Sequence, residues 1–217
     1  MTPSSGDMAE ALRQLGTATL GESGARAMPP RLRPAWPGAV LAAPALPVRC
    51  APGDNLAVHV AVATGPAAHA LVVDVGGVPE RGYWGEVLTT AAEARGLAGL
   101  VIDGGVRDVG ALGAHGFPAF SSTVALRGAT KRLPGSVGLA VEVAGVRVAP
   151  GDWVVGDADG VVVVPGEALD EVLSAGRARA EKEAGFFAAL RAGRTTIELL
   201  GLDTGPVETG VVGPPER

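Results

Sequence analysis

The sequence predicts an α/β fold, because short apolar runs that end in glycines alternate with segments of helical pattern. Two such runs, 70–75 and 98–103, each precede a Gly-Gly pair and flank a helical segment at 84–95. Parallel strands need a crossover of this kind, so the stretch is predicted to form a βαβ unit. Beyond it, turn signals separate short valine-rich runs, and a long amphipathic segment begins near residue 166.

Glycine, proline and apolar spacing define the other elements. Gly16, Gly21 and Gly24 interrupt a helical pattern near the amino terminus and predict short helical pieces there. Prolines between residues 29 and 37 predict an extended connector, and a turn at 52–55 precedes the next helix. The expected elements are a broken helix at 12–27, strands at 38–43 and 46–50, a helix at 56–63, the βαβ unit, a short helix at 108–115, strands at 119–126, 139–148, 153–155 and 161–164, and a helix at 166–191.

Composition narrows the classes of function. A chain of 217 residues with 47% hydrophobic and 19% charged residues can bury a sizeable core in one domain, or in one domain with an arm. A net charge of −5, with four Phe and one Tyr, offers neither a phosphate-neutralising surface nor a stacking platform, so no nucleic-acid partner is expected. The lone Cys50 excludes an intrachain disulfide and a multi-cysteine metal site, and we expect it in the core.

Targeting signals are weak in this sequence. The first fifteen residues lack the basic start and apolar stretch of a secretory signal. The uncharged stretch 55–73 is divided by Gly65-Pro66, which favours a buried helix and strand over a membrane span. We therefore expect no membrane partner and a cytoplasmic location.

The sequence lacks the characteristic motifs of several enzyme and cofactor-binding classes. The sequence contains no G-x-S-x-G elbow and no G-x-G-x-x-G fingerprint. Residues 157–160 resemble part of a calcium loop but lack both obligatory carboxylates of its register, so a turn is favoured. His59 and His69 are expected to be satisfied core or edge residues, and His115 is expected to favour the dipole of the helix that it ends.

The predicted βαβ unit brings two loops to one edge of the sheet, where ligands bind in such folds. The second loop carries Arg107, which can grip a carboxylate in two places, and Asp108, which can hold a hard cation. This combination suits a 2-oxo acid chelated to a divalent metal, although the two residues could instead pair and cap the next helix. The first loop adds helix-start amides that attract an anion, those of Gly85, Glu86, Val87 and Leu88.

The stretch from residue 71 to 108, LVVDVGGVPERGYWGEVLTTAAEARGLAGLVIDGGVRD, resembles the signature of the divalent-metal-dependent 4-hydroxy-4-methyl-2-oxoglutarate aldolases. That family also contains oxaloacetate decarboxylases and protein inhibitors of ribonuclease E. Its sharpest element is an acidic residue followed, about twenty residues later, by Arg-Asp, and here Glu86 precedes Arg107-Asp108 with residues 87–106 between them. The acidic residue is often Asp in these aldolases, so Glu86 reaches one methylene farther. The resemblance extends to LGTATL near the start, PGDN at 52–55, GFPAF at 116–120 and ELLGL at 198–202.

The resemblance implies a role for each matching residue. Asp108 matches the direct metal ligand, and Glu86 matches a carboxylate that holds the metal through water. Arg107 matches the residue that contacts the pyruvyl part of the substrate, and the amides of Val87 and Leu88, next to Gly85, match those that hold the substrate carboxylate. Few protein ligands with several waters suit Mg²⁺ or Mn²⁺.

A glutamate on the carboxyl-terminal helix of a neighbouring subunit also holds the metal through water in such enzymes. Glu183 is its match in this chain, with Glu181 a rival, and water near Glu86 and Glu183 is the expected catalytic base. The site is then shared between subunits. The family assembles as homotrimers or homohexamers, so we expect this oligomeric state here.

The fold implied by the resemblance is a swivelling α/β/β sandwich with a C-terminal helical arm. The stretch GDWVVGDADGVVVVP at 151–165 is similar to phosphohistidine domains, which share this fold, but their Thr-Ser-His motif is missing and phosphotransfer is disfavoured. We expect a single core domain at 1–165, an arm at 166–202 that packs on a neighbouring subunit, and a disordered tail at 203–217.

The function implied is that of a metal-dependent lyase. It would cleave 4-hydroxy-4-methyl-2-oxoglutarate-type substrates, decarboxylate oxaloacetate, or do both, releasing pyruvate through an enolate. The alternative is an inhibitor of ribonuclease E that acts by protein contact. A third reading is a structural ring protein whose metal site has lost activity.

Overall fold

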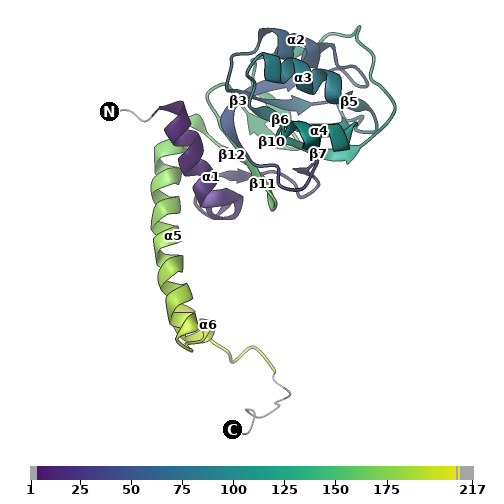
Figure 1. Cartoon of the computed structure of the whole chain (residues 1–217). Coiled ribbons are helices and arrows are strands. Elements are labelled where there is room, and N and C mark those ends of the chain that lie inside the picture. The colour runs from purple at the N-terminus through teal and green to yellow at the C-terminus, as the bar shows by residue number, and fades with distance from the viewer. Residues whose placement is uncertain (1–3, 209, 211–217) are drawn as a thin grey trace. The chain divides into compact units, whose positions relative to one another are not determined.

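The computed structural model describes residues 4–208 and 210 and divides the chain into two compact units, Met1–Arg177 and Ala178–Arg217 (Figure 1). The second unit holds the later part of α5 (Leu169–Arg191) and α6 (Thr196–Leu200). The first unit contains α1 (Ser5–Gly21), β1 (Arg26–Ala27), β2 (Arg33–Pro34), β3 (Leu41–Arg49), α2 (Leu56–Thr64), β4 (Ala70–Asp74), β5 (Gly82–Trp84), α3 (Glu86–Ala94), β6 (Gly99–Val106), α4 (Val109–His115), β7 (Ala119–Val124), β8 (Ser136–Val137), β9 (Val141–Val143), β10 (Val146–Val148), β11 (Trp153–Asp157), β12 (Gly160–Val164) and a 3₁₀ turn at Gly166–Ala168.

Four parallel strands form the centre of the first unit, in the order β3-β4-β6-β7. The crossover from β4 through α3 to β6 is the predicted βαβ unit, with Val73 opposite Ile102 in the ladder. Helices α2, α3 and α4 lie together over one face of this sheet (Figure 1). Beneath them, Val48, Leu71 and Leu100 are fully buried, as expected of parallel strands covered by helices.

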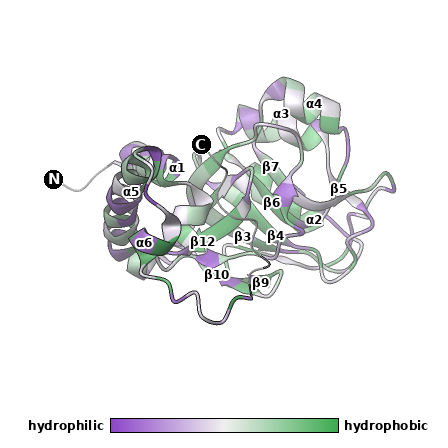
Figure 2. Ribbon diagram, turned by 90° about the horizontal axis from the view of Figure 1, so that it is seen from below, coloured by the Kyte–Doolittle hydropathy of each residue, from purple (hydrophilic) through white to green (hydrophobic). Residues whose placement is uncertain are grey.

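The opposite face of the sheet packs on further β structure. The hairpin β9–β10 packs through β9 on β4 and β3, where Val143 meets the cluster that contains Val72 and Val101. Strand β3 also pairs antiparallel with β11, which continues into β12, and α1 packs on these two strands. The strands of this unit are mostly hydrophobic along their length (Figure 2). The result is the predicted α/β/β arrangement, and a C-terminal helix is present as expected.

The predicted and observed strands differ in three respects. The strands expected at 38–43 and 46–50 are one strand, β3, because its first half pairs with β11 and its second half with β4, so that Pro44 lies where the ladder changes partner. The strand expected at 139–148 is a hairpin, because Ala144 and Gly145 both adopt positive φ angles, 54° and 82°, and reverse the chain.

The third difference concerns Gly104 and Gly105, which were expected in a loop but continue β6 to Val106. Strand β5 pairs with this extension. A Cβ atom at Gly105 would overlap the carbonyl oxygen of Arg81, so glycine serves here for close approach of two chain segments rather than for a turn.

The amino-terminal helix is broken at Gly16, as predicted, where φ is 74° and ψ is 163°. It begins earlier than expected, because Ser4 and Asp7 form a capping box. No helix in the described part, 4–208 and 210, is both long and apolar enough to cross a membrane. The end of the tail predicted at 203–217, residue 209 and residues 211–217, lies outside the described residues.

Candidate functional site

The candidate site lies where β5 passes into α3. Trp84 ends β5, is buried, and stacks on Phe117 with ring centroids 5.8 Å apart. Its indole Nε1 donates to the hydroxyl of Thr89 over 2.8 Å, which ties the strand to the first turn of the helix. Gly85 then precedes α3 in an extended conformation, so the helix starts directly after the strand at the edge of the sheet.

Asp108 adopts the left-handed conformation, with φ of 58° and ψ of 36°. Its side chain makes no capping bond to α4, although it precedes that helix. Instead, Oδ2 accepts a hydrogen bond of 3.1 Å from the backbone N–H of Glu86, at the start of α3. The alternative in which Asp108 caps its own helix is therefore wrong, and a strained backbone at this position is typical of functional sites.

Arg107 extends from the end of β6 towards the same helix start. Its backbone N–H donates to the carbonyl of Trp84 over 2.9 Å, while its side chain is 46% exposed. Arg107 and Asp108 do form an ion pair, as the alternative expected, with Nε 3.8 Å from Oδ2. This distance is too long for a hydrogen bond, so the guanidinium keeps its N–H donors for a ligand.

Gly85 permits this close arrangement. A Cβ atom there would lie 2.5 Å from Oδ2 of Asp108 and 3.0 Å from Cγ of Arg107. Any side chain at this position would displace one of the two charged groups. Gly85 is thus required at this position for a steric reason, in addition to the backbone amide that the sequence predicts at the site.

A pocket of about 160 Å³ opens at this edge of the sheet. The structure thus brings together most of the predicted residues. Those that line the pocket are Gly85, Val87, Leu88, Arg107 and Asp108.

Three further polar residues line the pocket and were missed by sequence reasoning as site residues: Asn55, His59 and Lys131. Oδ1 of Asn55 and Nε2 of His59 are buried without a hydrogen-bond partner, which marks them as available to a ligand. The prediction that His59 is a satisfied core or edge residue is therefore wrong. A signal was present, because His59 follows Asn55 of the PGDN motif by four residues, one helical turn on α2.

The charge state of His59 follows from its surroundings. Burial lowers the pKa of its imidazole, and the nearby ammonium of Lys131 lowers it further, more than the carboxylate of Asp54 raises it. The ring is therefore neutral at pH 7.

Asp54 fixes the loop that carries Lys131. Its buried carboxylate accepts hydrogen bonds from the N–H of Leu56 at 2.9 Å, the hydroxyl of Thr130 at 2.7 Å and the N–H of Arg132 at 2.6 Å. Burial by itself would raise the pKa of Asp54, but these hydrogen bonds lower it to about 2. One ionised side chain thus joins the start of α2 to the loop that carries Lys131.

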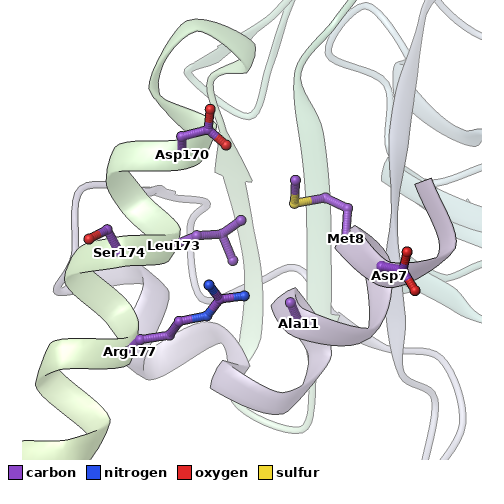
Figure 3. Close-up of a pocket in the computed structure, with 7 residues that line it drawn as sticks. All are labelled: Asp7, Met8, Ala11, Asp170, Leu173, Ser174 and Arg177. Carbon is purple, nitrogen blue, oxygen red and sulfur yellow. The ribbon is translucent and has the colours of Figure 1, made fainter. Parts of the chain in front are cut away.

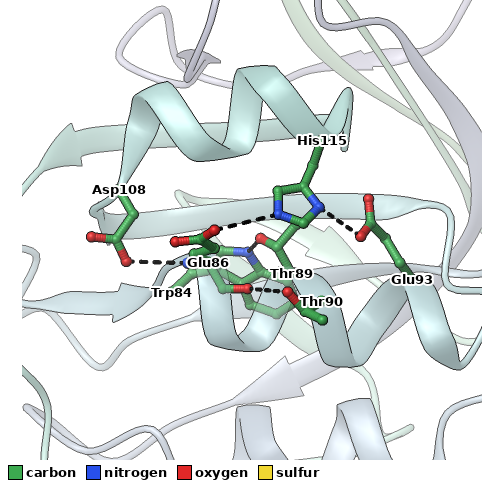
Figure 4. Close-up of polar contacts among 7 residues, drawn as sticks. All are labelled: Trp84, Glu86, Thr89, Thr90, Glu93, Asp108 and His115. Atoms are coloured by element: carbon green, nitrogen blue, oxygen red, sulfur yellow. Dashed lines mark hydrogen bonds and ion pairs between the residues drawn. The ribbon is translucent and has the colours of Figure 1, made fainter.

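Glu86 belongs to a small network between α3 and α4 (Figure 4). Its Oε1 lies 3.7 Å from Nε2 of His115, whose Nδ1 lies 2.8 Å from Oε2 of Glu93. The contact with Glu93, followed by that with Glu86, raises the pKa of His115. The expectation that His115 serves only the dipole of its helix is therefore incomplete.

Glu183 lies on the part of α5 that belongs to the second unit. Its Oε1 forms an ion pair with Nε of Arg179, which lies 2.9 Å away and one helical turn earlier. Glu181 is exposed on the same helix. Their predicted role at the site of a neighbouring subunit stays a prediction.

Other candidate positions have different explanations. A hollow of about 250 Å³ between α1 and the start of α5 has Met8, Ala11 and Leu173 at its centre and no unpartnered buried polar atom among its described residues (Figure 3). Burial raises the pKa of the Cys50 thiol to about 12, as expected for a core residue. Asp157 accepts hydrogen bonds from Thr17 and from the N–H of Asp159, so this segment is a turn, as predicted.

The fold and the site define a class: an α/β/β protein whose parallel sheet presents a guanidinium, carboxylates and a helix amino terminus at one edge. The sequence profile of the RraA-like family, described as Aldolase/RraA, matches residues 7–163. The chain belongs to this family.

Individual relatives agree with this placement. A protein of Halalkalibacterium halodurans and one of Albidiferax ferrireducens, each named "Putative 4-hydroxy-4-methyl-2-oxoglutarate aldolase", are 37% and 38% identical over 142 and 149 residues. Each match covers 65% of this chain, and the matches cover 68% and 86% of the two relatives.

Solved structures of two relatives also superpose on the chain. An uncharacterized protein of Pseudomonas syringae has a TM-score of 0.81 at 27% identity, over 92% of this chain and 95% of its own. Streptomyces coelicolor RraAS2, described as an unusual member of the RNase ES inhibitor RraA protein family, has a TM-score of 0.73 at 25% identity, over 87% and 98% of the two chains.

Proposed function

We propose that this protein is a divalent-cation-dependent carbon–carbon lyase that releases pyruvate from a 2-oxo acid. The observation that carries the proposal is that Arg107 and Asp108 line one pocket with the first turn of α3. Its substrates would be 4-hydroxy-4-methyl-2-oxoglutarate-type compounds, oxaloacetate, or both. The names of the curated relatives support the aldolase reading.

The donor set fits a largely hydrated ion. In the described part of the chain no three His, Cys, Asp or Glu side chains cluster as a complete metal site. Mg²⁺ and Mn²⁺ are often held by one or two carboxylates and keep several waters, so Asp108 with Glu86 nearby provides a suitable oxygen set. When bound, such an ion supplies a Lewis acid that stabilises negative charge on the substrate's keto oxygen.

The chain's own groups then bind the reacting end of the substrate. Val87 and Leu88 line the pocket and belong to the first turn of α3, so their amides lie at the positive end of the helix dipole and suit the carboxylate next to the keto group. The guanidinium of Arg107 can donate to the keto oxygen, where negative charge develops when the neighbouring carbon–carbon bond breaks. Removing one such donor commonly costs about 10²-fold or more in rate.

Other residues of the same pocket suit a second acidic group on the substrate. Lys131 supplies a positive charge, and neutral His59 can donate a hydrogen bond through Nε2 in one tautomer. Oxaloacetate and 4-hydroxy-2-oxo diacids both carry such a second carboxylate. These groups are therefore expected to discriminate diacids from pyruvate-like monoacids.

Aldol cleavage additionally needs a base for the substrate hydroxyl, whereas decarboxylation does not. Glu86, and Glu183 of a second copy, would orient the water that takes this proton. Because a second copy contributes Glu183, the active form in this proposal is a homotrimer or homohexamer. Its proposed location is the cytoplasm. One site could serve both reactions, because both pass through the same enolate.

A second candidate function is inhibition of a ribonuclease through protein contacts. It is favoured by the similarity to Streptomyces coelicolor RraAS2 over 87% of this chain. Such a role needs the fold and its surface but no cleavage chemistry. A dual role is compatible with both readings.

Release of pyruvate tests the first proposal. Purified protein is incubated with Mg²⁺ or Mn²⁺ and either oxaloacetate or a 4-hydroxy-2-oxo diacid, and pyruvate is measured with lactate dehydrogenase. We expect turnover that a chelator abolishes and that Asp108→Ala lacks, while the exposed control Glu142→Gln keeps it. Absence of chelator-sensitive pyruvate above the uncatalysed rate would refute the lyase proposal.

A further inference from the structure

The backbone and the side chain of Glu86 contact residues at the two ends of the short helix α4. Its backbone N–H donates to Asp108, directly before α4, and its carboxylate faces His115, the last residue of α4. Figure 4 shows α4 alongside α3, with Glu86 between these two residues. The side chain of Glu86 is 56% exposed, so little other packing limits its rotamers.

His115 is itself fixed. Its Nδ1 lies 2.8 Å from Oε2 of Glu93, and its side chain is only 25% exposed. Glu86 and Glu93 are seven residues apart, two turns of α3, and therefore lie on the same side of that helix. The imidazole thus occupies the space between two carboxylates of one helix face.

We propose that His115, anchored by Glu93, is a positioning residue that directs the carboxylate of Glu86 for its task beside Asp108. The inference rests on the proposed function, in which Glu86 helps to hold a divalent cation. A carboxylate has two oxygens, so Oε1 can face His115 while Oε2 serves the cation or its water. An aspartate in place of Glu86, one methylene shorter, would not span the same distance, so the histidine anchor matches the longer glutamate.

Binding of Mn²⁺, followed by electron paramagnetic resonance without substrate, measures this role apart from catalysis. We expect His115→Ala and Glu93→Ala each to weaken Mn²⁺ binding about tenfold, as is typical for outer partners of metal ligands. The same variants should lower kcat with little change in KM. Arg95→Gln, which removes an exposed charge at the end of α3, is the matched control and should match wild type.

A conservative variant separates positioning from simple packing. In His115→Gln the side-chain amide offers Glu86 a polar N–H₂ group in place of the Nε2 edge of the imidazole, so Mn²⁺ binding should return to within about threefold of wild type. In a Glu86→Asp background, His115→Ala should have no further effect, because the shorter carboxylate does not reach the imidazole. Thermal unfolding midpoints of all variants establish that they are folded.

The outcomes distinguish the two proposals. If wild type binds Mn²⁺ and His115→Ala binds it equally well, the positioning role is wrong while the lyase proposal stands. The same conclusion follows if His115→Gln is as weak as His115→Ala, or if His115→Ala is as harmful in the Glu86→Asp background as in the wild-type background. If wild type binds no Mn²⁺, the proposed metal dependence and the positioning role both fail.

Discussion

Replacing Asp54 by asparagine tests how the loop beside the pocket is held. The buried carboxylate accepts three hydrogen bonds, two of them from Thr130 and Arg132 on that loop. Asparagine keeps the shape of the side chain but has one acceptor oxygen instead of two and turns an N–H₂ group towards existing donors. The change should therefore destabilise the fold and release the loop that carries Lys131.

The magnitude follows from the pKa of Asp54. Its lowering from the ordinary value of 3.8 to about 2 means that the folded protein binds this proton less tightly than the unfolded chain does. At about 1.36 kcal/mol per pH unit, ionisation of Asp54 contributes about 2 kcal/mol to stability at neutral pH. This contribution is fully present above about pH 4 and disappears as the pH falls through about 2.

Urea unfolding at several pH values measures the effect. The free energy of unfolding of wild type should exceed that of Asp54→Asn by about 2 kcal/mol at pH 7. This difference should shrink steadily below about pH 4. Glu142→Gln, which removes an exposed carboxylate, should show no such pH-dependent difference. Equal stability of wild type and Asp54→Asn at pH 7, or a difference that persists unchanged at about pH 2, would refute the reasoning.

Three predictions concern the site itself. Gly85→Ala should fold but lose about 10²-fold in turnover, because its Cβ would lie 2.5 Å from Oδ2 of Asp108. Steady-state kinetics measure this loss, and a near-normal kcat would show that the close approach of Asp108 to residue 85 is not needed. Arg107→Lys should lose most activity, because an ammonium does not reproduce a planar two-pronged grip, and wild-type turnover would remove Arg107 from the substrate site. Asp108→Ala and Glu183→Ala, each inactive alone, should regain activity when their subunits are mixed and exchanged, with exchange verified by native mass spectrometry; mixed oligomers without activity would mean that no site is shared between subunits.

Local sequence signals predicted the parallel βαβ unit and the edge of the sheet at which several of the candidate residues meet. Neighbouring residues are enough to recognise the apolar runs before Gly-Gly, the helical stretch between them and the Arg107-Asp108 pair. The structure brings five of the predicted residues to one pocket. The break at Gly16 was also predictable, because glycine weakens a helix regardless of its surroundings. These features require only contacts within a short stretch of chain.

The tertiary structure decided which groups complete the site and how each polar side chain is satisfied. Whether the imidazole of His59 is buried in the core or faces a pocket depends on Lys131, 72 positions later in the chain, and on the loop held by Asp54. Whether Asp108 caps α4 or α3 depends on where β5 delivers the start of α3. The glycine pair at 104–105 predicts a loop from its local sequence, because the close approach of Arg81 comes from another segment of the chain. Local propensities specify elements, but hydrogen-bond partners, close approaches and burial arise only when distant segments meet.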